Sequence, residues 1–250
     1  MKRLIALLFV LSLTACSSNQ GPMGQVEPTR AAEINAELGL RYMIQGKYEL
    51  ALEKLDKAIE YNPDLAEAHH YKAELYRRLD KPKTADREYR RALDLAPDDS
   101  SIHNNYGVFL CGEAHRYEAG IQQFLQVLNN PVYPQRAQVY ENLGLCTLRI
   151  PDKAKAEQYF RKALEINPRM AKSLFSMAQL SFEDKNYLSA RAYLQRYHAI
   201  APRTPQTLWL GIRIERHLGG DDAVASYGML LLAKFPDSDE AQLYKASQKE

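Results

Sequence analysis

Proline returns along this chain at an almost constant interval. Six prolines stand 34, 34, 37, 34 and 34 residues apart, at Pro63, Pro97, Pro131, Pro168, Pro202 and Pro236. Self-similarity at a fixed interval indicates a repeat architecture, in which each unit buries its apolar face only against its neighbours. The residue before a proline is biased away from the helical conformation, so each of these positions is expected to follow the end of a helix. The interval therefore predicts a stack of similar helical units.

Small residues recur inside each interval and divide it into two helices. The first set is Gly39, Ala73, Gly107, Gly144, Ala178 and Gly211, and the second is Ala51, Ala85, Gly120, Ala156, Ala190 and Ala223. Because a small side chain lets two helices approach closely, each pair predicts one helical hairpin. With the aromatic residues and the closing prolines, this spacing resembles the tetratricopeptide repeat (TPR). The resemblance implies an all-α fold, a right-handed superhelix of about six TPR helix–turn–helix repeats with a short C-terminal capping helix. An unrelated all-α bundle is the alternative.

The N-terminus has the features of a targeting segment. The basic pair Lys2-Arg3 precedes the apolar run at 4–13, which is too short to span a bilayer as a helix. The Leu-Thr-Ala-Cys sequence at 13–16 resembles the bacterial lipobox, in which cleavage leaves an acylated cysteine. This resemblance implies lipidation of Cys16. Because Ser17 rather than aspartate follows, it also implies lipid anchoring in the outer membrane, facing the periplasm. An ordinary secretory signal with a chance cysteine is the alternative.

The targeting segment and the repeat together divide the chain into parts. We expect a lipoprotein signal peptide at 1–15, the lipidated Cys16 with a flexible tether at 16–31, and six TPR repeats at 32–238 (32–65, 66–99, 100–136, 137–170, 171–203, 204–238), followed by a C-terminal cap or tail at 239–250. The tether contains glycine, proline and serine without apolar periodicity, which is typical of a linker. Ser238 is expected to cap the last short helix.

The charge balance gives no reason to expect a nucleic-acid ligand. The chain has 33 Lys and Arg against 31 Asp and Glu, and two of the basic residues lie in the segment expected to be removed. The mature chain is therefore left with 31 of each sign, whereas nucleic-acid-binding proteins usually carry a basic excess. A glycine-rich phosphate loop is also missing from the sequence, so we expect no nucleotide and no small-molecule substrate.

The titratable residues form no pattern typical of an enzyme or a metal site. The histidines are His69, His70, His103, His115, His198 and His217, and they show no His-x-x-x-His spacing. His69 and His103 occupy a position where TPRs often carry tryptophan, which indicates packing. No serine or cysteine stands on a recognisable nucleophile elbow. We therefore expect no catalytic residue, no metal and no cofactor.

Three cysteines are present, and Cys16 is assigned to the lipobox. The other two, Cys111 and Cys146, lie on the first helices of adjacent repeats, which run side by side in a TPR stack. In the oxidising periplasm this placement predicts a disulfide between repeats three and four. Two free buried thiols that pack as small apolar side chains are the alternative.

The remaining candidate for function is the concave groove that the first helices line in this architecture. The expected groove residues are Ala36, Leu40, Met43 and Ile44 in repeat one, His70, Glu74 and Arg77 in repeat two, and Asn104 in repeat three. We interpret this set as a groove for an extended or helical peptide, with an apolar floor at repeat one. The alternative is that the N-terminal arm folds back over repeat one. Two further patches, Phe175 with Phe182 and Trp209 with Arg213 and Arg216, are explained at least as well by core packing.

The order of these features resembles one family in particular. The lipobox, the six repeats, the paired cysteines in 106–111 and 141–146, and the closing Leu-Trp-Leu-Gly-Ile-Arg at 208–213 with Lys-Phe-Pro at 234–236 resemble the PilF/PilW family of type IV pilus biogenesis lipoproteins, the pilotins. The resemblance implies an adaptor without catalysis that binds the secretin subunit of the pilus pore. Such an adaptor carries the secretin to the outer membrane and promotes its multimer assembly. It also implies binding through the first repeats.

Two other classes of function remain open at this stage. One is a different outer-membrane TPR lipoprotein that scaffolds cell-wall hydrolases or the outer-membrane assembly machinery. The other is an enzyme built on a helical repeat, which would require His, Glu or Asp side chains converging in the groove.

Overall fold

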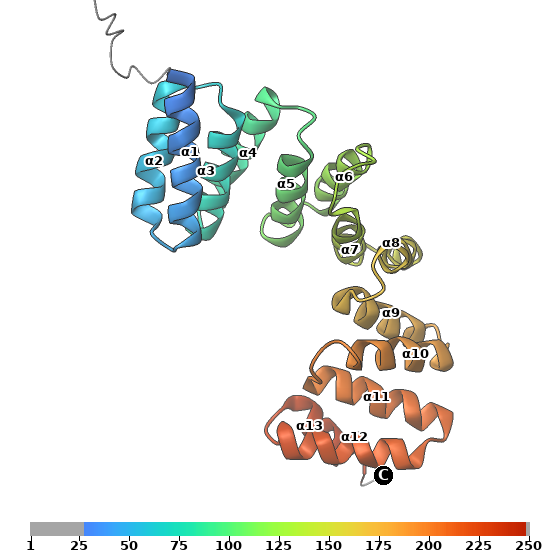
Figure 1. Ribbon diagram of the computed structural model, residues 1–250. Helices are drawn as coiled ribbons and strands as arrows, with labels where there is room; N and C mark the ends of the chain where they lie inside the picture. The colour runs from blue at the N-terminus through green and yellow to red at the C-terminus, as the bar shows by residue number, and fades with distance from the viewer. Residues whose placement is uncertain (1–27, 249–250) are drawn as a thin grey trace, which may run out of the picture.

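The computed structural model describes residues 28–248, which form an arc of α-helices (Figure 1). The helices are α1 (Pro28–Ile44), α2 (Tyr48–Tyr61), α3 (Ala66–Arg78), α4 (Pro82–Leu95), α5 (Ser100–Gly112), α6 (Tyr117–Leu128), α7 (Arg136–Thr147), α8 (Lys153–Ile166), α9 (Ala171–Glu183), α10 (Tyr187–His198), α11 (Pro205–Leu218), α12 (Asp221–Lys234) and α13 (Asp239–Ala246). No strand occurs within residues 28–248. Six hairpins and a short last helix confirm the all-α repeat fold.

The first helix of the repeat region begins earlier in the chain than expected. The signal peptide at 1–15, Cys16 and the tether up to residue 27 lie outside the described residues. Residues 28–31, which were assigned to the tether, form the first turn of α1. A proline is well suited to that turn, because its missing N–H would have no partner inside the helix there. Among the helices of the described part, none has the length and apolarity needed to cross a membrane.

Each repeat contributes one hairpin, from α1 with α2 to α11 with α12, and α13 packs against α11 and α12. The first helices of consecutive repeats also contact one another, from α1 and α3 to α9 and α11. In Figure 1, α5 and α7 lie on the inner side of the arc and α6 and α8 on the outer side. The first helices therefore line the inner face of the stack.

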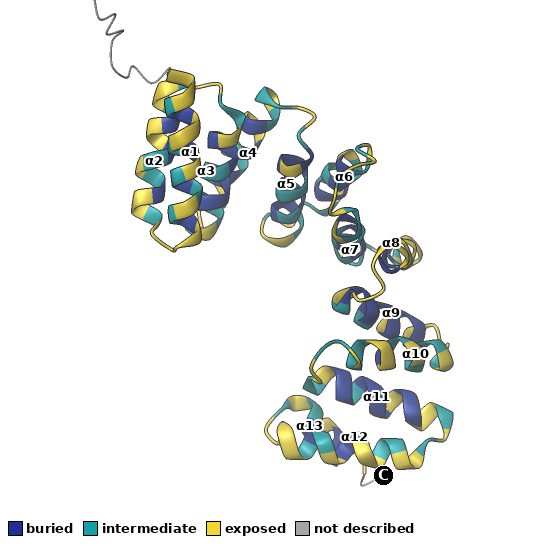
Figure 2. Cartoon of the chain, viewed as in Figure 1, coloured by how far each residue is buried: buried dark blue, intermediate teal, exposed yellow. Residues whose placement is uncertain are grey.

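The core is a series of apolar clusters along the stack, and the buried residues of Figure 2 follow the faces where helices meet. The small residues of the repeat explain how closely the two helices of a hairpin approach. A Cβ atom at Gly107 would lie 2.7 Å from the ring of Phe124, and one at Gly144 would lie 2.6 Å from the ring of Phe160. Both rings are buried. A larger side chain at either glycine would force the two helices apart.

Candidate partner-binding face

Helix α1 exposes only part of the apolar surface that the sequence predicted. Ala36 and Met43 are 1% and 2% exposed, so their expected place in the groove was wrong. Met43 belongs to the same apolar cluster as Leu75 of α3, which shows that this face of α1 packs against repeat two. Leu40 is half-buried and Ile44 is 71% exposed. These two are the residues of the predicted floor that a partner can reach.

A hydrogen-bond network engages the polar residues predicted for repeat two. Glu74 is buried and accepts hydrogen bonds from the Tyr89 hydroxyl and from Arg77 Nη2, the latter at 2.9 Å. Burial raises the pKa of Tyr89, which keeps its hydroxyl protonated as a donor. Arg77 Nη1 donates to Glu113, the residue that follows α5, at 2.9 Å. Glu74 therefore links α3 to α4, and through Arg77 to the end of α5, and was wrongly expected to line an open groove.

A second polar contact joins repeats two and three. His70 is buried, and its Nε2 atom accepts a hydrogen bond from Asn105 Nδ2 at 3.0 Å. Burial lowers the pKa of His70, which favours the neutral ring that can accept this bond. Asn104 is half-buried and donates to Asn105 Oδ1 at 3.2 Å. Of these predicted groove residues, His70 is thus structural, while Asn104 stays partly accessible.

The inner face is hollowed over repeats three to five. The hollow encloses about 600 Å³ between α5, α7 and α9. Half-buried apolar side chains line it, namely Val108, Leu145, Leu148 and Phe175. Two exposed basic residues, Arg149 and Lys172, lie on its wall. Among residues 28–248, neither has a carboxylate within ion-pair distance.

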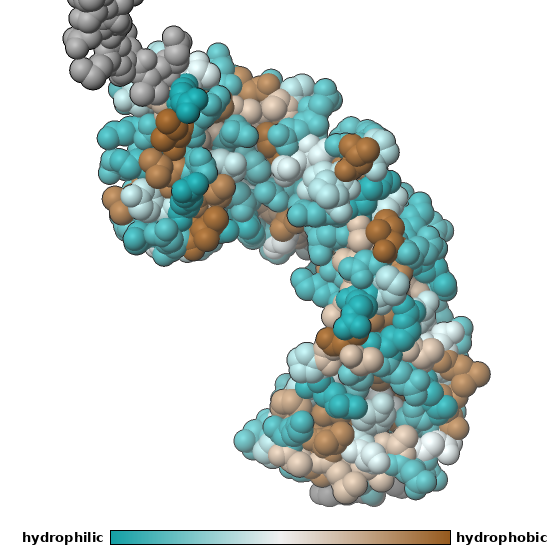
Figure 3. Space-filling model, viewed as in Figure 1, coloured by the Kyte–Doolittle hydropathy of each residue, from teal (hydrophilic) through white to brown (hydrophobic). Residues whose placement is uncertain are grey.

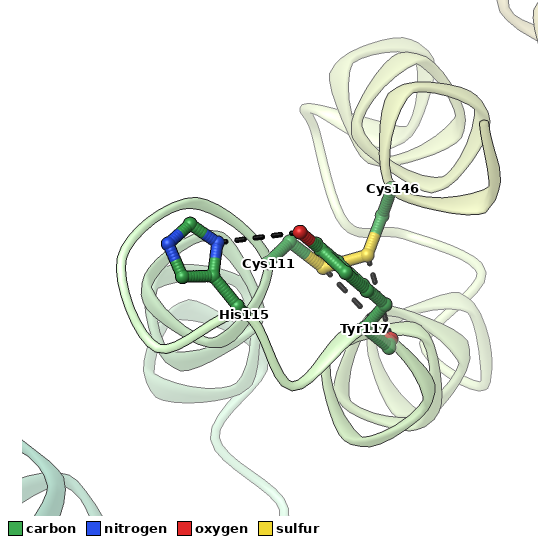
Figure 4. The surroundings of a disulfide bond; sticks show 4 residues. All are labelled: Cys111, His115, Tyr117 and Cys146. Atoms are coloured by element: carbon green, nitrogen blue, oxygen red, sulfur yellow. Dashed lines mark hydrogen bonds between the residues drawn. A yellow bond between two sulfur atoms is a disulfide. The ribbon is translucent and has the colours of Figure 1, made fainter. Parts of the chain in front are cut away.

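A disulfide joins two of the helices that form this hollow. Cys111 of α5 and Cys146 of α7 are bonded, with Cα atoms 5.7 Å apart (Figure 4). The Tyr117 carbonyl oxygen lies 3.4 Å from Cys146 Sγ. Because a disulfide sulfur carries no proton, this is a close contact and not a hydrogen bond. The Tyr117 hydroxyl and His115 Nδ1 are 3.3 Å apart beside it. The bridge therefore ties repeat three to repeat four at the wall of the hollow.

A second recess continues along the inner face between α9, α11 and α13. It encloses about 840 Å³, and a smaller one of about 230 Å³ connects it to the first hollow through Phe175. Phe182, Trp209 and Arg213 line both of these C-terminal recesses. Phe182 and Trp209 are half-buried and reach the surface. At the sequence level, core packing explained the patches at Phe175 with Phe182 and at Trp209 with Arg213 and Arg216 at least as well as binding did. In the structure both patches form part of the concave surface.

Several residues of this face were missed at the sequence level. Leu145, Leu148 and Arg149 follow Gly144 at the same spacing at which Leu40, Met43 and Ile44 follow Gly39. Extending that spacing to repeat four would have found these three residues, whereas Lys172 has no counterpart among the predicted groove residues. In the part of the chain that the structure describes, no group of three His, Cys, Asp or Glu side chains could hold a metal ion. The arrangement can hold the side chains of a polypeptide.

The repeats match known families along most of the stack. Residues 39–80 and 66–99 match models of the tetratricopeptide repeat, and residues 127–234 match the middle TPR-like domain of cilia- and flagella-associated protein 70. The type IV pilus assembly protein PilF of Pseudomonas aeruginosa is 36% identical over 251 residues, which cover 97% of this chain and 98% of PilF. The chain belongs to the PilF/PilW family.

An uncharacterized protein and two solved structures are also similar to the chain along most of its length. An uncharacterized protein of Haemophilus influenzae is 31% identical over 176 residues, 70% of this chain and 97% of that one. The solved structure of Pseudomonas aeruginosa PilF superposes with a TM-score of 0.80 at 35% identity, covering 88% of this chain and 99% of that chain. The crystal structure of PilW, a widely conserved type IV pilus biogenesis factor, superposes with a TM-score of 0.74 at 29% identity, covering 85% and 97%.

Proposed function

We propose that this chain is an outer-membrane lipoprotein adaptor, a pilotin, that binds the secretin subunit of a type IV pilus machinery. In this role it promotes the localisation of the secretin to the outer membrane and its assembly into a multimer, and hence pilus biogenesis. The observation that carries the proposal is the similarity to PilF along 97% of the chain. The lipobox-like sequence at 13–16 and the recessed, partly apolar concave face support it.

The proposed mechanism needs a membrane anchor and a surface that binds the partner. The acylated Cys16 holds the chain in the outer membrane, and the segment up to residue 27 lets the TPR stack reach a partner. Holding two proteins on one membrane raises their effective concentration. In repeat one, Leu40 and Ile44 offer the accessible apolar contact, and the half-buried Asn104 lies on α5. These three residues form the proposed secretin-binding surface, while Arg77 is already paired with Glu74 and Glu113.

The anchor is tested with Cys16→Ala in cells that depend on this chain for piliation. We expect a folded, non-acylated protein, secretin monomers that fractionate away from the outer membrane, and loss of surface pili. Ser18→Ala, which leaves the lipobox intact, is the matched control. Normal secretin rings in the outer membrane of the Cys16→Ala cells would refute the carrier mechanism.

The binding surface is tested with Leu40→Glu combined with Ile44→Glu, and with Ile44→Glu alone. The single variant changes a side chain that is 71% exposed, so it tests binding without disturbing the core. The control is Leu188→Glu with Met229→Glu, which changes apolar residues that are 67% and 68% exposed on α10 and α12. Secretin capture should fall in the first pair of variants and not in the control. If the Ile44→Glu variants keep their helical circular dichroism spectrum and still capture secretin as wild type does, the secretin-binding site does not include Leu40 and Ile44.

A further inference from the structure

Two arginines of α11 lie on aromatic rings at the C-terminal recess. The guanidinium carbon of Arg213 is 4.3 Å from the ring centroid of Phe182. The guanidinium carbon of Arg216 is 5.8 Å from the ring centroid of Trp209 and 5.9 Å from that of Tyr244. Arg216 Nη2 also donates a hydrogen bond to Ser247 Oγ at 2.7 Å. A guanidinium held against an aromatic ring is fixed in its plane and keeps its N–H edge free for another partner.

Neither arginine has a carboxylate partner in the described part of the chain. The ion pairs there include Lys153 with Glu183 of the same recess, but none within 4.0 Å of Arg213 or Arg216. Both side chains are exposed. An exposed guanidinium that stacks on a ring and has no carboxylate partner can bind an anion from outside the molecule.

The recesses over repeats three to six carry an excess of charge of the same sign as these two arginines. Six basic residues line these connected recesses, and the acidic residues there are Glu183 and Glu240. The basic residues are Arg149, Lys153, Lys172, Lys185, Arg213 and Arg216. The formal charge of the full chain is only +2, so positive charge is concentrated around these recesses. Its complement is a negatively charged partner.

The apolar side chains that line the same recesses indicate which kind of anion would bind there. Half-buried Phe175, Phe182 and Trp209 follow the same recesses. His217 stacks on Tyr187 with ring centroids 4.2 Å apart and extends the aromatic surface beside Phe182. A free inorganic anion would leave these rings without a partner. A peptide that alternates acidic and large apolar side chains would pair with the arginines and cover the rings together.

We propose that the concave face over α9, α11 and α13 is a second polypeptide-binding site, specific for a segment in which Asp or Glu flanks an aromatic residue or leucine. Carboxylates of that segment pair with Arg213 and Arg216, and its apolar side chain packs on Phe182 and Trp209. The site lies four repeats away from Leu40 and Ile44 and does not depend on secretin being the partner.

The test is selection of a random dodecapeptide library, displayed on phage, against the purified full-length chain. We expect enriched peptides with Asp or Glu next to Phe, Trp, Tyr or Leu. Binding of a fluorescein-labelled enriched peptide, measured by polarisation, should weaken by at least about tenfold in Arg213→Glu with Arg216→Glu. It should also weaken between about 50 and 500 mM salt. The control is Arg203→Glu with Lys234→Glu, which changes exposed basic residues outside the recesses.

Two further variants distinguish geometry from charge. Arg213→Lys with Arg216→Lys keeps the charge but loses the planar, stacked donor group, so it should weaken binding by a smaller factor than the glutamate pair. Enrichment of neutral or basic peptides, no enrichment, or equal affinity in the glutamate pair and the control would each overturn the proposal. So would light scattering that shows a self-associated chain dispersed by the glutamate pair, since the occupant would then be a second copy.

Discussion

Glu141 of α7 holds the start of α9, and removing it is expected to destabilise the middle of the stack. Glu141 is 4% exposed, and its Oε2 atom accepts hydrogen bonds from Ser173 N at 3.0 Å and from Ser173 Oγ at 2.8 Å. The residue before α9, Met170, has no side chain that could cap the helix. Glu141 therefore caps a helix of the next repeat and joins two hairpins.

The expected cost follows from these contacts. A hydrogen bond to a charged group contributes about 1.5–3 kcal/mol, and a carboxylate at a partly buried helix N-terminus gains up to about 2 kcal/mol from the helix dipole. The desolvation of the buried carboxylate offsets part of this gain. We expect Glu141→Ala to lower the free energy of unfolding by about 3 kcal/mol. Glu141→Gln keeps an oxygen acceptor and should cost about 1 kcal/mol.

The assay combines urea unfolding, followed by helical circular dichroism, with hydrogen exchange of the α9 segment at 171–183. Repeat stacks can unfold in parts, so a single urea midpoint does not show which helix is destabilised. Hydrogen exchange locates the destabilised helix. Protection should fall in α9 and stay unchanged in α2 at 48–61. Ser173→Ala is the paired variant of a double-mutant cycle and should lose most of its own effect in the Glu141→Ala background. A cost below about 1 kcal/mol for Glu141→Ala would refute the reasoning.

Two other predictions concern the same helices and their neighbours. The Cys111–Cys146 bridge spans 35 residues of sequence, so Cys111→Ser with Cys146→Ser should lower the free energy of unfolding by about 4 kcal/mol in denaturant titrations, with no difference from wild type in excess reductant. Burial lowers the pKa of His70 below the ordinary histidine value of about 6.5, so the unfolded chain binds more protons at mildly acidic pH. The free energy of unfolding is therefore unaffected by His70 above that pH and decreases as pH falls toward the folded pKa. His70→Gln should make thermal stability fall less steeply between about pH 7.5 and 5.5, leaving the part due to His198, whose pKa burial also lowers. An equal slope in the variant would contradict this assignment.

The fold could be predicted because its determinants are local and repeated. Gly144 lies against Phe160 because no side chain fits between the two helices, and that requirement recurs at Gly107 against Phe124. Ser238 caps α13 by accepting a hydrogen bond from Ala241 N at 3.2 Å, as its place before a short helical pattern indicates. The start of α1 could not be predicted in the same way, since glycine and proline near residue 22 concealed the helical turn at 28–31.

The groove was predicted less well, because a helical repeat has two apolar faces that a single sequence does not distinguish. Met43 and Ile44 are neighbours on α1, yet one packs among buried residues and the other is exposed to solvent. Which of them faces the next repeat depends on how far each hairpin is rotated against its neighbour. That rotation is set by contacts between repeats, such as Met43 in the cluster of Leu75, and not by the pattern within one repeat.

The two ends of the concave face differ in whether their arginines are already paired with carboxylates, and this difference bears on where a charged partner could be held. In repeats two and three, Arg77 already shares Glu74 and Glu113, so a partner that approached it would have to break bonds within the stack. In the C-terminal repeats, Arg213 and Arg216 lie on aromatic rings, and within residues 28–248 no carboxylate is within ion-pair distance of either, so a partner would not have to displace one. On the face seen in Figure 3, apolar areas stand apart from one another among hydrophilic ones. The disulfide and Glu141 connect α5, α7 and α9 between these two ends. The two proposed sites are therefore separated by cross-linked repeats and differ in the partner they would take, an apolar segment at repeat one and an acidic segment at repeats five and six.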